Sequence, residues 1–495
     1  MFHPKRWNRG PGGPAPDPRN TQPGEHPVLR WLAPLALTGA LALAPMAHAI
    51  PSFARQTGWS CSVCHTIYPQ LTPIGRLFKL EGYTTANLAG MQELKQKIRR
   101  MAPLELNRVP PLSIMIQASS AWIRGGHANQ FGSGDPTGQG AIEFPEQVSL
   151  FYAGRITRNM GTFFHVTYTH SGAFGADDSD IRWAEHATEP DGSTLIYGAE
   201  INNTPTEPDP WNSVPDWNWP FATSNYSPLR DIPATYIQQA AGASEPIAGL
   251  GGYLAYLFGT GENHWLYLEA DVYRSAVGIG SGTNQFFGAE TLGPTRNVAP
   301  YLRIAYEQNY EEWNWEVGAL GMDAKIYPTT AAIGTTDRFL DYGLDGQLQY
   351  LDLTGNQTFT AHVSFIHETE DWQADPAIGF KPNPIDTLNT ASVNGQYLVN
   401  RRYGAGAGYF WAWGTPDPAL YGPATGNPAA LVSANGSPDT NGLTLELDYL
   451  EAQNAEFTLQ YSAFNKYLGA SSNYNGAGQN ASDNNILTLL MWFAF

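Results

Sequence analysis

From about residue 110 to the end of the chain, hydrophobic and polar residues alternate with a period of two. Residues 454–465 place apolar and polar side chains on opposite faces: Phe457, Leu459, Tyr461 and Ala463 against Glu456, Thr458, Gln460 and Ser462. The same alternation recurs in 340–350, 356–368 and 443–450. This pattern predicts β-strands that have one apolar face and one wet face.

About sixteen segments of this kind follow one another. Their expected starts are near 111, 144, 160, 179, 192, 248, 263, 299, 312, 338, 356, 385, 401, 441, 454 and 484. Most are about 9–13 residues long, the length that a tilted strand needs to cross a bilayer. Some connections are tight, such as 451–453, whereas 201–246, 275–298 and 414–440 are long and rich in Pro, Gly and Asn. Short turns on one side and long loops on the other are typical of outer-membrane barrels.

Aromatic residues near the strand ends support the same prediction. We expect an interfacial girdle that includes Trp313, Trp315, Tyr350, Tyr449 and Trp492. The last strand, 487–495, is apolar, alternates and closes on a terminal Phe, which resembles the terminal signature of bacterial outer-membrane barrels. A soluble, secreted β-sandwich or β-solenoid is the alternative, because its core also alternates. The prediction is therefore an all-β fold, a transmembrane antiparallel β-barrel of about 16 strands over residues 110–495.

The first 49 residues read as an export signal. Residues 1–30 are rich in Pro, Gly and Arg, and an apolar run follows at 31–46. The run stops at Ala47-His48-Ala49, a small-x-small cleavage site. A transmembrane anchor is the alternative, but about 16 residues interrupted by Pro34 and Pro45 are short for a membrane span. We expect a cleaved signal peptide at 1–49, a small segment at 50–109 and the barrel at 110–495.

Both cysteines of the chain lie in one motif, Cys61-Ser62-Val63-Cys64-His65. C-x-x-C-H is the signature of covalent haem attachment, in which two thiols bind the haem vinyl groups and the histidine binds the iron. A zinc site would need two more ligands, and a redox C-x-x-C would normally lie in a thioredoxin-like βαβ pattern. The motif therefore predicts one covalent haem c held by Cys61 and Cys64, with His65 as an axial ligand in an N-terminal c-type cytochrome segment.

The second axial ligand of the iron has several candidates. Met91, Met101 and Met115 follow the motif, although a methionine is often a gap-filling core residue. A His/Met pair would raise the haem potential relative to a His/His pair. Met115 is a possible distal ligand because the alternation of the first strand turns it inward, just after the haem segment. A histidine from elsewhere, such as His165 or His362, is the remaining alternative.

The charge is distributed unevenly along the 495 residues. The whole chain carries 27 basic and 45 acidic residues, a net charge of −18, which disfavours a nucleic-acid partner. Residues 50–108 carry +5 and the rest of the mature chain −26. Acidic residues fall on the faces expected to line the lumen: Glu269, Asp271, Glu316, Asp341, Asp345, Glu446, Asp448 and Glu456. Attraction would dock the basic segment in or under the pore, unless these are ordinary solvated charges.

Residues 50–83 carry a resemblance to a known family. The strings are IPSFARQTG at 50–58, CSVCH at 61–65, PQLTPIGR at 69–76 and FKLEGY at 78–83. They resemble the fused outer-membrane cytochrome–porins of iron-oxidising bacteria, in which a monohaem c-type segment is joined to a porin barrel. Beyond residue 83 the resemblance is one of architecture alone.

The resemblance implies an oxidoreductase of the Gram-negative outer membrane. Its haem would take an electron from extracellular Fe(II) and pass it to a periplasmic c-type cytochrome. Its other partners would be outer-membrane lipid and the machineries for barrel assembly and cytochrome c maturation. Two alternatives stay open: a haem-plugged conduit for another electron donor or acceptor, and a diffusion porin whose haem is structural or sensory.

Overall fold

The computed structural model describes thirteen stretches of the chain. They are residues 51–85, 110–125, 139–169, 174–213, 219–241, 247–275, 285–286, 290–291, 294–329, 332–352, 354–379, 381–422 and 433–495. All of them belong to one compact unit, Ala47–Phe495. The expected signal peptide, Met91 and Met101 lie outside the described residues.

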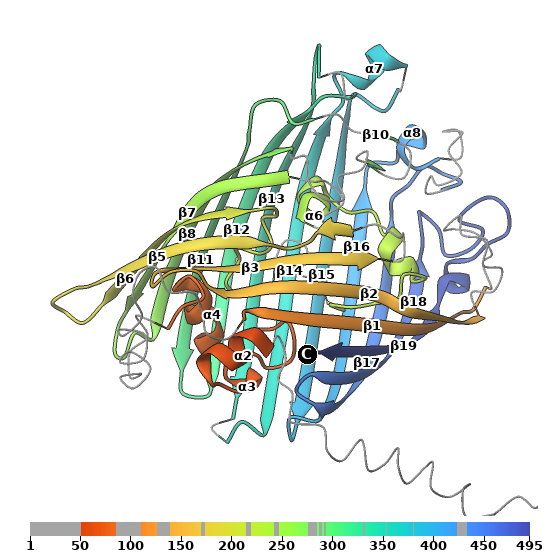
Figure 1. Cartoon of the computed structure of the whole chain (residues 1–495). Coiled ribbons are helices and arrows are strands. Elements are labelled where there is room, and N and C mark those ends of the chain that lie inside the picture. The colour runs from red at the N-terminus through yellow and green to blue at the C-terminus, as the bar shows by residue number, and fades with distance from the viewer. Residues whose placement is uncertain are drawn as a thin grey trace, which may run out of the picture. The chain divides into compact units, whose positions relative to one another are not determined.

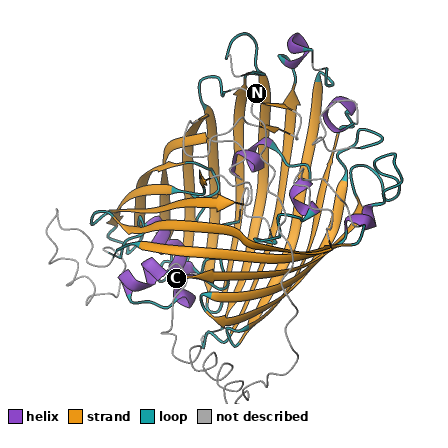
Figure 2. Ribbon diagram, turned by 45° about the vertical axis from the view of Figure 1, so that its right-hand side comes forward, coloured by secondary structure: helices purple, strands orange, loops and turns teal. Residues whose placement is uncertain are grey.

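Antiparallel strands close into a barrel (Figures 1 and 2). The strands of the wall are β1 (Leu112–Ile123), β2 (Gln139–Arg155), β3 (Met160–Thr169), β4 (Phe174–Ala176), β5 (Asp180–Thr188), β6 (Thr194–Asn202), β7 (Ile247–Phe258), β8 (His264–Ser275), β11 (Ala299–Tyr310), β12 (Trp313–Ile326), β13 (Asp337–Leu351), β14 (Gln357–Asp371), β15 (Ile385–Val399), β16 (Tyr403–Gly414), β17 (Thr440–Ala452), β18 (Ala455–Lys466) and β19 (Ile486–Ala494). The sheet closes because β1 pairs with both β2 and β19.

Sixteen strand positions surround the lumen. The sheet contains 17 strands, but the three-residue β4 and the longer β5 both pair with β3 and so share one position. Two further strands, β9 (Gln285–Phe286) and β10 (Glu290–Thr291), form a separate pair. The predicted barrel of about sixteen strands is confirmed. The largest error in a strand start is at β2, which begins at residue 139 rather than 144.

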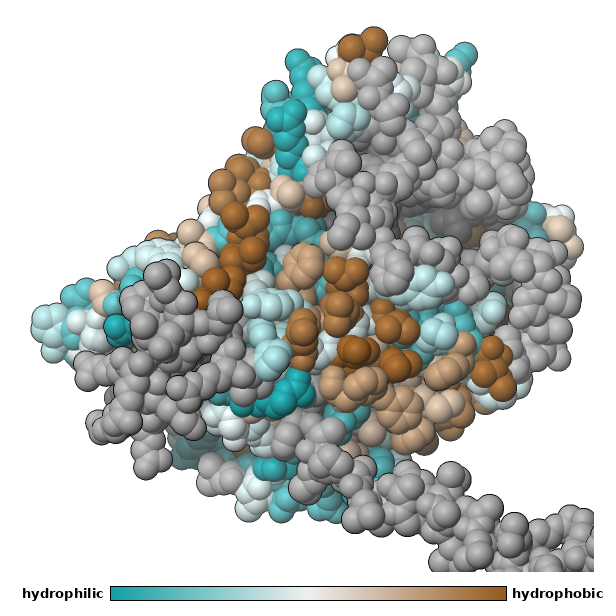
Figure 3. Space-filling view, viewed as in Figure 1, coloured by the Kyte–Doolittle hydropathy of each residue, from teal (hydrophilic) through white to brown (hydrophobic). Residues whose placement is uncertain are grey.

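The barrel wall has an apolar outer face and a polar inner one. Along β8, Leu266, Leu268 and Val272 are exposed to the outside, whereas Glu269 and Asp271 are buried inside. In Figure 3 the hydrophobic residues of the near face gather across the middle of the wall. Such a wall suits a lipid environment, because strand pairing around a closed barrel satisfies its backbone groups. Within the described part of the chain, no helix is long and apolar enough to span a membrane.

Most residues of the expected girdle lie outside the wall near the short turns. Trp313 is 46% exposed, and its ring lies 5.1 Å from that of Tyr350 on the neighbouring strand. The prediction was wrong for Trp492, whose ring stacks on Tyr68 of the N-terminal segment at 5.6 Å. Trp492 lies on the inward face of β19, so it belongs to the lumen.

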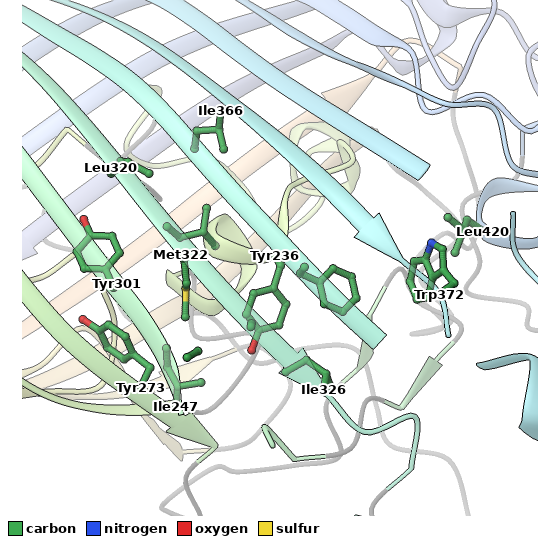
Figure 4. Packing of buried hydrophobic residues seen from close by; sticks show 14 of the residues in the cluster. Tyr236, Ile247, Tyr273, Tyr301, Leu320, Met322, Ile326, Ile366, Trp372 and Leu420 are labelled. Carbon is green, nitrogen blue, oxygen red and sulfur yellow. The ribbon is translucent and has the colours of Figure 1, made fainter. Parts of the chain in front are cut away.

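The described parts of the long connection between β6 and β7, residues 203–213 and 219–241, fold into the lumen. Its residue Trp219 packs against Gly406 and Gly408 of β16, where an added Cβ would come within 2.8 and 2.6 Å of the indole ring. Its helix α6 (Tyr236–Ala241) is anchored to the wall, because the backbone N–H of Tyr236 donates to Glu368 at 2.6 Å. Figure 4 shows Tyr236 within a buried hydrophobic cluster formed with the inward side chains of the wall. The sequence predicted a long loop here but not its place inside the barrel.

Candidate functional site

Three short helices form the N-terminal segment: α2 (Pro51–Thr57), α3 (Cys61–Cys64) and α4 (Pro73–Leu80). Thr72 caps α4 by accepting a hydrogen bond from the Gly75 N–H, and Pro73 occupies the first helical position. Figure 1 places the three helices beside the C-terminus. The Cys61 N–H donates to the side chain of Gln453 at 3.0 Å, in the tight turn after β17. The segment therefore docks at the short-turn end of the barrel.

The C-x-x-C-H motif is held against α4 by backbone contacts. The helical turn α3 closes with a hydrogen bond from the His65 N–H to the Cys61 carbonyl at 2.8 Å. The Thr72 N–H donates to the Cys64 carbonyl at 2.9 Å. An added Cβ at Gly75 would lie 2.3 Å from that carbonyl oxygen, so the approach of the two helices needs a glycine.

Cys61, Cys64 and His65 line one cavity that is partly open to its surroundings. Most of its other walls are apolar or aromatic, with a few polar groups: Phe53, Ala54, Thr57, Trp59, Ser60, Tyr68, Pro69, Leu71, Gly75, Phe78, Lys79, Tyr83, Phe163, Glu207 and Asn212. The structure thus brings together the three residues predicted to bind haem.

Burial sets the protonation of the motif. Burial lowers the pKa of His65 to about 4, against a smaller opposing effect of the Pro69 and Gln70 backbone groups, so its imidazole is neutral near pH 7. Burial raises the pKa of Cys64 to about 12, and the nearby Cys61 thiol acts in the same direction. Cys61 and Cys64 form no disulfide with each other.

Tyr68 lines this cavity and also two neighbouring spaces. Its ring lies 5.8 Å from that of His65. One of these spaces is narrow and is lined by Tyr68, Met115, Phe151 and Trp492, among others. Met115 is inward-facing, as predicted, and 4% exposed, and its sulfur accepts a weak hydrogen bond from Gln117 at 3.9 Å. Met115 is not among the described residues that line the cavity of Cys61, Cys64 and His65.

The two histidine alternatives also lie outside that lining. His165 is buried on β3, where its Nε2 lies 2.8 Å from the Thr167 hydroxyl and its ring stacks on Phe151 at 4.2 Å. His362 is buried on β14, where its Nε2 lies 3.0 Å from Gln347. The structure therefore places both imidazoles in hydrogen-bonding networks of the wall.

Two buried cations fix α4 inside the barrel. Arg76 is fully buried, and its Nε lies 2.8 Å from Glu307 of β11. Lys79 Nζ lies 3.3 Å from Glu207 in the β6–β7 connection and donates to Asn212 at 2.8 Å. The expected docking of basic residues of the segment in an acidic barrel is seen here at Arg76 and Lys79.

Sequence reasoning missed Tyr68, Glu207 and Glu307. Glu307 and Arg76 are separated by 231 residues, and no local pattern pairs residues so far apart. The alternation of β11 did place Glu307 on the same face as Arg303, which was the available signal. The eight acidic residues expected in the lumen are all on the inward face, seven of them at 8% exposure or less.

Comparisons with known proteins concern the barrel. No family model matches the chain, and no curated protein matches it. Among solved structures, the chain is similar to the OmpT loop L8 deletion mutant of Vibrio cholerae, with 11% identity, a TM-score of 0.40, and coverage of 78% of this chain and 98% of the other. It is also similar to the outer-membrane channel DcaP of Acinetobacter baumannii, with 11% identity, a TM-score of 0.41, and coverage of 78% and 96%. The anion-selective porin of Comamonas acidovorans gives 11% identity, a TM-score of 0.37, and coverage of 78% and 98%. These descriptions name no cytochrome, and the assignment of a barrel rests on the strand pairing of this chain.

Proposed function

We propose that the barrel crosses a bacterial outer membrane and holds one c-type haem in its N-terminal segment. The observation that carries the proposal is the cavity shared by Cys61, Cys64 and His65. Its donor set fits the group: two thiols at the attachment spacing, a neutral imidazole, and apolar aromatic walls for a flat macrocycle. Cys61 and Cys64 would form the thioethers, and His65 would bind the iron.

The haem, when bound, supplies one-electron redox chemistry. The chain's own residues hold and shield it. Phe53 and Phe78, whose rings meet edge-to-face at 5.2 Å, give the cavity apolar walls, and lower polarity around a haem is one means of setting its potential. Tyr68 lines this cavity and also the small space lined by Met115.

The reaction that fits this arrangement best is transfer of single electrons across the outer membrane. Fe(II) is the proposed donor and a periplasmic c-type cytochrome the proposed acceptor, as the resemblance of residues 50–83 implies. The acidic lumen supports a cationic donor, because inward carboxylates raise the local concentration of cations. The cavity lies at the end of the short turns, which in such barrels is the periplasmic end, so the acceptor would meet it there.

Stopped-flow mixing tests this function. Purified oxidised protein in detergent is mixed with Fe(II), and the haem absorbance is followed. We expect reduction of the haem at a rate that depends on the Fe(II) concentration. Reduction by dithionite but not by Fe(II) would contradict the iron proposal and favour a conduit for another donor or acceptor.

A diffusion porin is the second candidate, because barrels of about 16–18 strands can leave an aqueous channel. The barrel and the comparisons agree with this simpler function. Against it stands the β6–β7 connection, which fills part of the lumen and is anchored there at Tyr236. Conductance in planar bilayers separates the two: a stable, open, ion-conducting channel in the haem-loaded protein would favour the porin.

A further inference from the structure

Three carboxylates meet inside the barrel, outside the cavity of the haem motif. Glu200 on β6, and Glu269 and Asp271 on β8, point into the lumen and are 1%, 3% and 3% exposed. Each offers an oxygen atom, and these three atoms lie within 4.8 Å of one another. That spacing lets a single cation contact all three.

The negative charge at this place exceeds the positive charge that contacts it. Arg182 Nη2 lies 3.1 Å from Glu200, but Arg182 also pairs with Asp180. Glu269 and Asp271 receive hydrogen bonds from neutral donors, the hydroxyls of Tyr267 at 2.8 Å and Tyr273 at 3.0 Å. Buried carboxylates without a counter-charge are costly, so a bound cation would stabilise the group.

Unused oxygen atoms point to a ligand at the same place. Glu269 Oε1 and Asp271 Oδ1 are buried and accept no hydrogen bond within the described part of the chain. Independently, the hydroxyl of Tyr301 is buried and lacks a partner among the described residues, and Tyr301 lies directly opposite Asp271 on the adjacent strand. Figure 4 shows the Tyr301 hydroxyl pointing to the same side as that of Tyr273, which donates to Asp271.

Gly251 of β7 leaves room for this arrangement. A Cβ at this position would lie 1.5 Å from Asp271 Oδ1, so any other residue would displace that carboxylate. The oxygen without a hydrogen bond is thus held over a backbone position that has no side chain. The backbone of β7 therefore fixes the position of the Asp271 carboxylate.

We propose that Glu200, Glu269 and Asp271 bind a divalent cation in the lumen. Carboxylate oxygens suit Mg²⁺, Ca²⁺, Mn²⁺ and Fe²⁺ better than metals that prefer thiolates. Arg182 links the site to the haem motif, because its Cζ lies 6.0 Å from the ring centre of Tyr83, which lines that cavity. The identity of the bound cation as the electron donor Fe(II) rests on the proposed function. The existence of the cation site does not depend on that function.

Titration of the purified, haem-loaded protein with Mn²⁺ tests the site, with free Mn²⁺ measured by electron paramagnetic resonance. We expect saturable binding at one site in the wild type. Glu269→Gln, Asp271→Asn and Glu200→Gln should each weaken it by about tenfold or more, since even loss of an outer-shell partner costs about 10–100-fold in metal affinity. Glu316→Gln is the matched control, because this buried lumen carboxylate lies outside the group and 3.4 Å from Arg303; its binding should stay at the wild-type level.

Absence of Mn²⁺ binding by the wild type, or equal binding by the wild type and all three variants, would overturn the proposal. Variants are compared only when folded, as shown by the heat-dependent gel mobility of a closed barrel, and three substitutions keep the test decisive if one fails to fold. Mn²⁺ binding is read without any change of the haem. If the protein binds Mn²⁺ but its haem is not reduced by Fe(II), the proposal that Fe(II) is the electron donor is contradicted. If Fe(II) reduces the haem but the protein does not bind Mn²⁺, the proposed cation site is contradicted.

Discussion

Gly75 is the residue at which α4 meets the haem motif. Gly75→Ala would place a methyl group 2.3 Å from the Cys64 carbonyl oxygen, so the two helices must move apart. Such overpacking costs about 1–3 kcal/mol. We expect less covalent haem per chain and an altered haem potential, measured by haemochrome absorbance and redox titration.

Gly175→Ala is the control for that substitution, because nothing lies within 4 Å of the added Cβ. It should keep wild-type haem content and potential. Equal haem content and an unchanged potential in Gly75→Ala would contradict the tight contact between α3 and α4.

Met115 offers a second test at the scale of one side chain. Met115 lines a neighbouring space and is not among the described residues that line the cavity of Cys61, Cys64 and His65, so we expect Met115→Ala to leave the absorption spectrum and the potential of the haem unchanged. Loss of a methionine-to-iron absorption band, together with a lower potential, would instead identify Met115 as the distal ligand. Met115→Leu keeps the volume of the side chain and controls for packing.

Single residues were predictable from the sequence where a local rule governs them. The spacing of Cys61, Cys64 and His65 identified residues that the structure brings to one cavity, and alternation oriented Met115 correctly. The prediction for Trp492 was wrong because an aromatic residue near a strand end can belong either to the interfacial girdle or to the lumen. Its stacking on Tyr68, far away in the chain, decides between the two.

Helix α4 depends on a buried ion pair. Arg76→Gln would leave Glu307 without its cation, and breaking a buried pair costs about 3–5 kcal/mol. We expect faster hydrogen exchange of the α4 amides, measured by mass spectrometry. Arg338→Gln is the control, because it removes a more exposed ion pair with Asp323. Loss of such a pair lowers the stability by about 0–1 kcal/mol, so hydrogen exchange in α4 should not change. Wild-type exchange in Arg76→Gln would contradict the anchoring role.

The 3-10 helix Pro228–Asp231 of the β6–β7 connection should respond to pH. Burial raises the pKa of Asp231 from 3.8 to about 7, partly opposed by Arg230. The folded connection therefore holds a proton that the unfolded chain has released, and its stability falls as the pH rises from about 4 to 7. Hydrogen exchange around Asp231 should show this slope, and Asp231→Asn should flatten it. An equal slope in the variant would contradict the assignment.

Elements differ in how far the sequence determines them. Sixteen strands were predictable because each faces lipid on one side and the lumen on the other, which imposes a period of two. The course of the β6–β7 connection was not, because its residues Trp219 and Tyr236 meet strands β16 and β14 through contacts across the lumen. Proline-rich composition indicates a loop but not the surface against which it packs.

At the scale of the whole molecule, the chain combines a basic haem-motif segment with an acidic barrel. Charge arithmetic predicted their attraction, and Arg76 and Lys79 show the contacts through which it acts. The barrel by itself fits a porin. The proposed electron transfer would require a haem in this segment, at the short-turn end of the barrel.

Covalent haem content tests this account most directly. The protein is purified from outer membranes of a host with cytochrome c maturation, denatured and extracted with acidified acetone, and the residual haem is measured as haemochrome. The account predicts one haem per chain that resists extraction, and none in the Cys61→Ala, Cys64→Ala double variant, whose barrel still folds. A folded wild-type barrel without covalent haem would contradict the account, and the diffusion porin would then be the function that remains.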